Sequence, residues 1–552
     1  MEHNKYILIA LGLLSLASCT DINDQKPDGQ YISGDQKTET VGAIPSRIKA
    51  DVVGMYHMMA VPATYFGEAA GRADDGGYFS LALSSDLNAA DMVCANSGYN
   101  WFSVCSNYSD RTATYANPRM RYGLPYNQIK VANDIIAAMD STSTDKTVTA
   151  YIGQAKACRA FAYMTIAPFF QFRYATSADK ACVPIVTEKT TNFSDNPRAT
   201  VKQVYDLIIS DLSDARVRLS SFSRDDKSYV NLAVVDGLLA RAYLNMGKYA
   251  EAAAAAKNAI SETDATPATR ADVSKPYFYD ANESDWMWGL LLSASDVSSS
   301  AKNEATEGAQ LASFSSDGYA PIGCYKRINS LLWNKIPSTD IRKQWWVDDN
   351  LKSSLLDGQT WTTGDAVFNG QDIPAGVITD VKVAFDPYTN VKFGMKSGIG
   401  NSVNNNDYPL MRVEEMYLIE AEGLAMSGNL PDAKTILENF VKTYRDPSYT
   451  SKATSAQDFQ NEVWFQRRIE LWGEGFAMSD IMRLGKPVVR IHGTDTGNWP
   501  STFAFNMSPD DPWLIMRFPQ KELNNNSGVV DNTGGTQPKS LQNSNLTDGV
   551  TD

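Results

Sequence analysis

Histidine is nearly missing from this chain, which holds only His3, His57 and His492 among its 552 residues. His3 precedes a segment that we expect to be removed, and the other two cannot form a three-histidine zinc site. A Ser-His-Asp mechanism would have to use one of these two, which we interpret as packed or surface residues. The sequence therefore predicts no catalytic residue, no enzymatic activity and no metal site.

A basic excess is also missing, because 50 Lys and Arg face 64 Asp and Glu and give a net charge of −14. Nucleic-acid binding needs a basic surface, so we expect no nucleic-acid partner. The composition, 43% hydrophobic and 21% charged, is that of an ordinary folded protein and excludes wholesale disorder.

Long hydrophobic runs are limited to Tyr6–Leu14, which follows Lys5 and is too short to span a bilayer. It is the right length for the core of a signal peptide, and Leu16-Ala17-Ser18-Cys19 follows at once. This run resembles a bacterial lipobox, in which cleavage before the cysteine makes Cys19 the lipidated residue. We predict a lipoprotein signal peptide over 1–18 and a lipidated tether over 19–38, with an ordinary signal peptide as the alternative. The mature chain would then be anchored to a membrane without crossing it.

Cysteine motifs are missing as well. The other five cysteines are odd in number and contain no Cys-x-x-Cys pair, which argues against an iron-sulfur or zinc-ribbon site. Cys94 and Cys105 either pair in an oxidising compartment or remain buried thiols. We expect no cofactor. Asp348-Asp349-Asn350 offers oxygen ligands, but without EF-hand spacing we interpret it as a solvated turn, so structural calcium is possible and not predicted.

The body of the chain shows helical periodicity. From Val201 to Leu219 apolar residues recur at helical spacing, and Thr200 with Gln203 forms a capping box. Helical patterns also cover about 118–140, 147–172, 230–260, 410–444 and 458–484.

Two of these segments repeat one pattern. Ala240, Tyr243, Gly247, Ala252 and Ala259 take the small, large, turn and packing positions of a tetratricopeptide-like helix hairpin. Each matches a residue 181 positions later, in Ala421, Leu424, Gly428, Ala433 and Phe440. A generic hairpin with a glycine turn is the alternative for each segment alone. Units this far apart require an insertion of another kind between them.

Two stretches look like insertions. Residues 262–408 are rich in Ser, Asp, Gly and Asn and hold six of the eleven tryptophans, and 61–116 is rich in tyrosine. Functional surfaces tend to lie on loops held by a rigid scaffold. Trp286 and Trp288 are exceptions that we expect to be buried in a strand-like run.

Four segments resemble the SusD/RagB family of outer-membrane glycan-binding lipoproteins. Tyr126–Ile136 is similar to its Tyr-x-x-Ile-x-x-x-Asn helix. Ala157–Phe170 and Val183–Val186 are similar to its Arg-Ala-x-x-Tyr helix and to the Val/Ile-Pro-Leu-Val segment that follows it. Tyr408–Glu422 resembles its Pro-x-x-Arg-x-x-Glu-x-x-Leu-x-x-Ala-Glu signature, and Arg467–Arg483 its Arg-Arg-x-Glu-Leu-x-x-Glu-Gly segment. The resemblance runs from Cys19 to about Val530.

The resemblance implies a mainly α fold, in which a tetratricopeptide-like helix-pair scaffold carries a large irregular, loop-rich subdomain. One domain would cover 39–523, with its scaffold at about 39–60, 117–261 and 409–485, ligand-binding insertions at about 61–116 and 262–408, and a polar tail, extended or disordered, at 524–552. The protein would lie at the outer membrane, lipid-anchored and facing the cell exterior. It would capture an oligosaccharide and deliver it to a TonB-dependent outer-membrane transporter. The alternatives are a protein-interaction scaffold, a binder of a non-carbohydrate nutrient, and a surface glycosidase.

The charges of these signatures look at first like an active site. Glu470 and Glu474 share a helix face, but that spacing alone does not make carboxylates catalytic. We interpret Arg467 with Glu470, and Asp480 with Arg483, as ion pairs that pin the terminal helix. The same structural interpretation holds for Arg412, Glu414 and Glu422.

Sugar binding combines aromatic rings, which stack on a pyranose face, with amide, carboxylate or guanidinium groups for the hydroxyls. Asn96–Phe102 offers this combination on a glycine-containing loop where related proteins carry part of their binding aromatics. An aromatic hinge packed on the scaffold is the alternative there, and a surface turn is the alternative for Gly71–Tyr78. The predicted ligand-binding residues are Tyr99, Asn100, Trp101, Arg72, Asp74, Tyr319, Tyr325 and Trp333. A neutral or host-derived oligosaccharide fits the acidic net charge.

Overall fold

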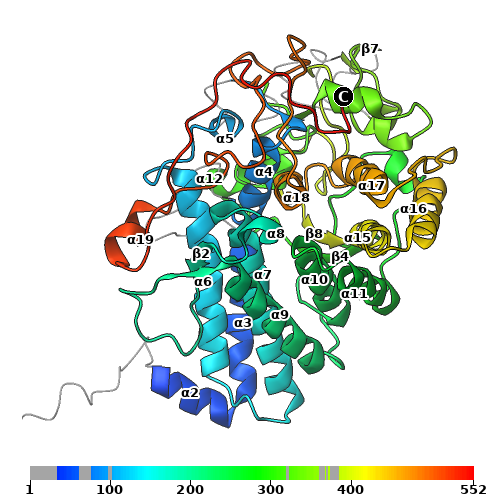
Figure 1. Cartoon of the computed structure of the whole chain (residues 1–552). Coiled ribbons are helices and arrows are strands. Elements are labelled where there is room, and N and C mark those ends of the chain that lie inside the picture. The colour runs from blue at the N-terminus through cyan, green and yellow to red at the C-terminus, as the bar shows by residue number, and fades with distance from the viewer. Residues whose placement is uncertain are drawn as a thin grey trace, which may run out of the picture.

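A row of long helices forms the body of the protein, as its computed structural model shows (Figure 1). The structure describes residues 34–60, 76–96, 102–318, 323–357, 359, 367–368, 371–372 and 385–552. Neighbours in the row pack against one another in chain order. The row consists of α6 (Ala116–Ala137), α7 (Lys146–Phe170), α9 (Val201–Arg218), α10 (Leu232–Asn245), α11 (Tyr249–Glu262), α15 (Val413–Met426) and α16 (Leu430–Tyr444). The five predicted helical segments are confirmed by these helices together with α17 (Ala456–Glu470) and α18 (Ala477–Leu484).

The two repeated units are helix hairpins with the same turn. Gly247 and Gly428 have φ values of +71° and +101°, which glycine adopts without a Cβ penalty. The turn hydrogen bond from Lys248 N to Tyr243 O, 2.9 Å, recurs 181 residues later from Asn429 N to Leu424 O, 2.8 Å. This confirms the predicted pair of hairpins. The residues between them loop out, so that α11 packs directly on α15.

The predicted capping box begins α9. The Thr200 side chain accepts a hydrogen bond from Gln203 N at 3.2 Å, and the Gln203 side chain accepts one from Thr200 N at 2.8 Å. Two otherwise unpaired helix N–H groups are satisfied in this way.

A helix that the sequence did not predict lies inside the first loop-rich stretch. In α4 (Tyr78–Asn88) all but one of the eleven residues are buried. A helix buried on all sides has no polar stripe, so the periodicity that reveals surface helices is absent. The stretch 61–116 is therefore less irregular than its composition indicates.

The strands form four two-stranded antiparallel sheets. In the longest, β4 (Trp286–Leu290) pairs with β8 (Tyr408–Arg412), and every residue of both strands is buried. The predicted burial of Trp286 and Trp288 is thus confirmed. Because β8 leads into α15, this sheet ties the loop-rich residues 262–408 to the second hairpin. The other pairs are β1 (Met92–Val93) with β5 (Arg327–Ile328), β2 (Ala181–Pro184) with β3 (Arg198–Thr200), and β6 (Val367–Phe368) with β7 (Gln371–Asp372).

The remaining helices of the described residues are short. They are α2 (Gly34–Ala43), α3 (Lys49–Ala60), α5 (Ser103–Ser106), α8 (Tyr174–Ser177), α12 (Ser300–Asn303), α13 (Glu307–Gln310), α14 (Ser330–Lys335), α19 (Gln520–Asn525) and the 3-10 helices Pro45–Ile48, Asp272–Ser274, Ile341–Trp345 and Ser354–Leu356. Among the described residues, no helix is both long and apolar enough to cross a membrane.

The C-terminal tail is irregular but packed. Asn532 and Asp548 are buried, and Asp548 pairs with Arg468 at 2.8 Å. A tail that was expected to be extended or disordered is therefore held by polar contacts with the body, which its composition does not reveal. Cys94 is a buried free thiol 3.1 Å from the Ser106 hydroxyl, so it forms no disulfide with Cys105.

Candidate functional site

The signature charges form a buried ion-pair network between the second hairpin and α17. Arg412 at the end of β8 donates from Nε and Nη2 to both oxygens of Glu474, each at 2.9 Å. Glu470 accepts from Arg445 Nε and Nη2 at 2.8 Å and from Arg342 Nη1 at 3.2 Å. This confirms that the charges are structural.

One predicted partner is wrong. Arg467 pairs with Asp480 at 2.7 Å instead of with Glu470, because Arg445 and Arg342 already occupy the Glu470 carboxylate. Asp480 and Arg483 pair at 2.7 Å as predicted. Arg483 also holds Glu422 at 2.6 Å, so α18 is pinned to α15 and α17.

The two glutamates are poorly suited to acid catalysis. Burial alone would raise the pKa of Glu470, but Arg445, Arg412 and Arg342 outweigh it and hold the pKa well below its usual range. The pKa of Glu474 is lowered as well, because Arg412 and Lys392 outweigh its burial. A glycosidase needs one carboxyl group with a raised pKa as proton donor. Neither member of this pair provides one.

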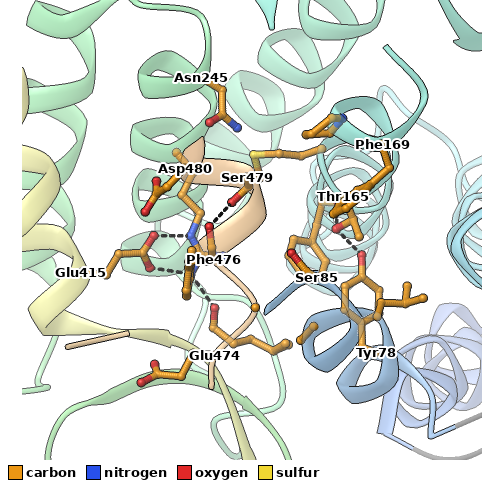
Figure 2. A pocket seen from close by; sticks show the side chains of 18 of the residues that line it. Tyr78, Ser85, Thr165, Phe169, Asn245, Glu415, Glu474, Phe476, Ser479 and Asp480 are labelled. Carbon is orange, nitrogen blue, oxygen red and sulfur yellow. Dashed lines mark hydrogen bonds and ion pairs between the residues drawn. The ribbon is translucent and has the colours of Figure 1, made fainter. Parts of the chain in front are cut away.

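A pocket lies between the first buried helices and the repeats (Figure 2). Figure 2 shows Tyr78 and Thr165 on one side, with Glu415 and Phe476 on the other. Arg241 binds Glu415 through Nε at 2.8 Å and through Nη2 at 2.6 Å. These pairs join α10 to α15 across the pocket wall.

The size of this pocket decides what it can hold. Its volume is about 130 Å³, whereas sites for drug-sized ligands usually measure about 300–1,000 Å³. The acids that line it are paired with arginine or lysine: Glu415 with Arg241, Glu474 with Arg412 and Lys392, and Asp480 with Arg467 and Arg483. The pocket is therefore a seam between packed elements and is too small for an oligosaccharide.

The described residues at or near the ends of four loop-rich segments are Gly76, Cys94, Gly318, Tyr325 and Phe385, and we call the part of the molecule to which they lead the loop face. All of them except Gly318 are buried. The antiparallel pairing places Val93 opposite Arg327. The chain leaving β1 toward 97–101 and the chain arriving from 319–322 at β5 therefore lie at the same end of this sheet.

Two glycines at further loop ends pack so closely on residues 305–309 that a Cβ would not fit. A Cβ on Gly76 would lie 1.8 Å from Ala305 O, and one on Gly318 would lie 2.8 Å from Ala309 O. Ala305 lies just before α13 (Glu307–Gln310), and Ala309 lies within it. Gly76 and Gly318, which adjoin residues 61–75 and 319–322, thus both pack against residues 305–309.

Aromatic packing adds a fourth segment. The ring of Tyr325 lies edge-on to Phe385, with centroids 4.9 Å apart, and Arg327 lies 3.5 Å from Asp386. Phe385 follows residues 373–384, so the end of this segment also reaches β5. The loop face gathers parts of the chain that are about 310 residues apart.

Of the predicted ligand-binding residues, Arg72, Asp74, Tyr99, Asn100, Trp101 and Tyr319 lie outside the described residues, as does Cys19. Tyr325 is buried against Phe385. Trp333 is half-buried, donates from Nε1 to Lys343 O at 3.2 Å, and has Lys343 Nζ 4.2 Å from its ring centre. Both side chains support the loops here, and their contact with a ligand stays a prediction.

The sequence did not reveal Arg327 or Phe385 as parts of this face. Strands β1 and β5 have two residues each, which is too short for an alternating pattern. Only the pairing itself shows that they belong together.

Two family models match the chain. One, described as "Starch-binding associating with outer membrane", matches residues 67–244, and the other, described as "SusD family", matches residues 358–534. Together they span more than half of the chain.

The chain is similar to one relative by sequence and to several solved structures by fold. A SusD-like protein of Formosa agariphila is 23% identical over 421 residues, covering 67% of this chain and 74% of the relative. The crystal structure of a SusD-like carbohydrate binding protein from Bacteroides vulgatus matches with 23% identity and a TM-score of 0.69, covering 88% of this chain and 97% of that chain. Surface glycan-binding protein A from Bacteroides thetaiotaomicron, solved in complex with laminarihexaose, matches with 18% identity and a TM-score of 0.62, covering 88% and 99%. The predicted fold class is thereby confirmed.

Proposed function

The chain belongs to the SusD family, and we propose that it binds an oligosaccharide through its loop face at the cell surface and delivers it to a TonB-dependent outer-membrane transporter. The observation that carries this proposal is the packing of the ends of four loop-rich segments against β1, β5 and residues 305–309. A rigid scaffold that presents several loops together is the usual arrangement of a binding site.

The residues proposed to touch the sugar are Arg72, Asp74, Tyr99, Asn100, Trp101, Tyr319, Tyr325 and Trp333. Aromatic rings would stack on the pyranose faces, and the amide, carboxylate and guanidinium groups would bind the hydroxyls. The net charge of −14 favours a neutral ligand over an anionic one. Laminarihexaose is the ligand of a structural neighbour at 18% identity, so the sugar of this chain is left to experiment.

Membrane attachment forms the second part of the proposal. The apolar run Tyr6–Leu14 and the lipobox-like residues before Cys19 support cleavage and lipidation at Cys19. The polar residues that follow would serve as a tether. An anchored binder then stays within reach of a transporter in the same membrane, which raises the effective concentration of captured sugar.

The test is calorimetric titration of residues 20–552 with a panel of neutral plant, host and microbial oligosaccharides, together with product analysis of each mixture. Binding without product is the expected result and names the ligand class. Release of reducing sugar would establish a glycosidase instead. A folded protein that binds no glycan would favour a protein-interaction scaffold or a non-carbohydrate nutrient.

A further inference from the structure

A groove on the flank of the helix row has the dimensions of a ligand site. It lies between α6, the residues that follow β2 and the short helix α19, with a volume of about 530 Å³. Figure 1 shows these three elements on the same side of the molecule. The volume falls within the range of about 300–1,000 Å³ that is common for ligand sites, and it is four times that of the seam in Figure 2. We call it the flank groove and define it by Tyr122, Tyr126, Asn127, Phe193, Asn196 and Glu522.

Phe193 gives the first indication of a ligand. The residue is 59% exposed, which makes it the most exposed aromatic residue among those whose surroundings the structure describes. A phenyl ring left in water does not contribute the stabilisation of about 1.5–3 kcal/mol that its burial would give. An aromatic ring held in solvent at the edge of a groove is the arrangement expected for stacking on a ligand.

Two tyrosines give the groove an aromatic wall. The rings of Tyr122 and Tyr126 lie 4.3 Å apart between centroids, at an interplanar angle of 33°. The Tyr126 hydroxyl donates to Pro184 O at 2.5 Å, which fixes the ring against β2. Tyr126 is half-buried and Tyr122 is buried behind it, and both residues line the groove.

The opposite wall is held in place by amides. Asn196 N donates to Asn526 Oδ1 at 2.9 Å, and Asn526 Nδ2 donates to Asn196 O at 2.9 Å. Ser527 N donates to Ser194 O at 2.8 Å. These bonds join the Phe193 loop to the residues after α19, so a ligand would meet a preorganised wall and would not have to order it.

The charges at the groove select against acidic ligands. Asp134, Glu188 and Glu522 line it, and Lys130 is the one basic residue among its lining residues. Lys130 pairs with Asp134 at 2.6 Å. Glu188 Oε2 lies 2.7 Å from Nη1 of Arg159, whose side chain is buried. With Arg159 counted, the three carboxylates face two cations and leave one net negative charge at the groove, which disfavours a polyanion.

We infer that the flank groove is a second carbohydrate site, which takes a neutral oligosaccharide. Phe193 and Tyr126 supply apolar faces for the pyranose rings, and Asn127, Thr190 and Glu522 supply the hydroxyl partners. This inference rests on the proposed function, because it assigns the same class of ligand to a separate part of the molecule. A glycan long enough to touch both sites would bind with avidity.

The test is titration of the mature chain with laminarihexaose, cellohexaose and maltohexaose, comparing wild type, Phe193→Ala, Trp101→Ala and the double variant. Val217→Ala is the matched control, since Val217 is 74% exposed on α9 and does not line the groove. We expect two sites in wild type for the hexasaccharide that binds. Phe193→Ala should weaken one of them at least tenfold and leave the thermal midpoint unchanged, and Val217→Ala should alter neither.

The outcomes separate this inference from the proposed function. A single site that is lost in Trp101→Ala and unchanged in Phe193→Ala would overturn the flank groove and leave the loop face standing. A single site lost only in Phe193→Ala would support the groove and overturn the loop face. No binding of any neutral glycan by the wild-type protein would overturn both, and a protein partner that binds through Phe193 while glycan binding is unchanged would also overturn the inference.

Discussion

Arg412 and Glu474 form a two-point ion pair in the interior, with both bonds at 2.9 Å and both side chains almost completely buried. Arg412 lies at the start of the second repeat hairpin, and Glu474 lies just after α17. Lys392 Nζ, from the loop-rich subdomain, also reaches Glu474 at 2.7 Å. Three parts of the fold that are remote in the chain are therefore joined at one carboxylate.

Removing this arginine should strongly destabilise the protein. Arg412→Ala leaves Glu470 and Glu474 buried with less compensating charge, and breaking a buried pair in this way costs about 3–5 kcal/mol. Lys130→Ala is the control, because its pair with Asp134 is exposed and such pairs contribute about 0–1 kcal/mol. Urea denaturation measures both. Similar losses in the two variants would contradict the role assigned to the network.

The stability of the protein should depend on pH through the carboxyl group of Asp86. Burial raises the pKa of this carboxyl to about 7, although Gly475 N and Ala477 N donate to it at 3.0 and 3.1 Å. Above pH about 4 the unfolded chain ionises this group while the folded protein keeps it protonated, so its contribution to stability is full at low pH. That contribution falls by about 1.4 kcal/mol per pH unit as the pH rises toward 7.

Asp86→Asn removes the titrating carboxyl group. Between pH 5 and 7 the free energy of unfolding of the variant should therefore fall by about 2–3 kcal/mol less than that of wild type. Urea denaturation at both pH values gives the comparison. Parallel pH profiles for the two proteins would show that Asp86 titrates normally.

Close approach of the two hairpins should depend on Gly423. A Cβ there would lie 2.6 Å from Tyr249 O on α11, and a backbone atom cannot easily move away. Gly423→Ala should cost about 1–3 kcal/mol through overpacking. Gly54→Ala on α3 is the opposite control, because nothing lies within 4 Å of the added Cβ and alanine should gain about 0.5–1 kcal/mol in a helix. Thermal unfolding of both variants should show opposite shifts, and a neutral Gly423→Ala would contradict the packing.

Glycan affinity should depend on Trp101. Loss of one stacking ring in Trp101→Ala is expected to weaken oligosaccharide binding at the loop face at least tenfold. Calorimetry on the folded variant measures this, and co-purification tests whether the transporter is still bound. A pure interaction scaffold would keep its partner and show no change in glycan binding, which would remove Trp101 from the site.

Lipid attachment should depend on Cys19. Cys19→Ser is expected to abolish incorporation of radiolabelled fatty acid and to release the protein from the membrane fraction. Cys94→Ser is the control, since Cys94 is a buried thiol inside the fold and its loss should leave labelling intact. Labelled Cys19→Ser protein would show that the lipid is attached elsewhere.

The sequence by itself determined the repeated hairpins, the capping box of α9 and the burial of Trp286 and Trp288. These features depend on turn chemistry and periodicity within short windows, where the cause and its effect are neighbours in the chain. The tertiary structure alone decided that Arg467 binds Asp480, that α4 is a helix, and that Phe193 and Tyr126 line the same groove. Each of these features depends on which remote segment packs against a given charge or surface. A local sequence pattern carries no information about such long-range contacts.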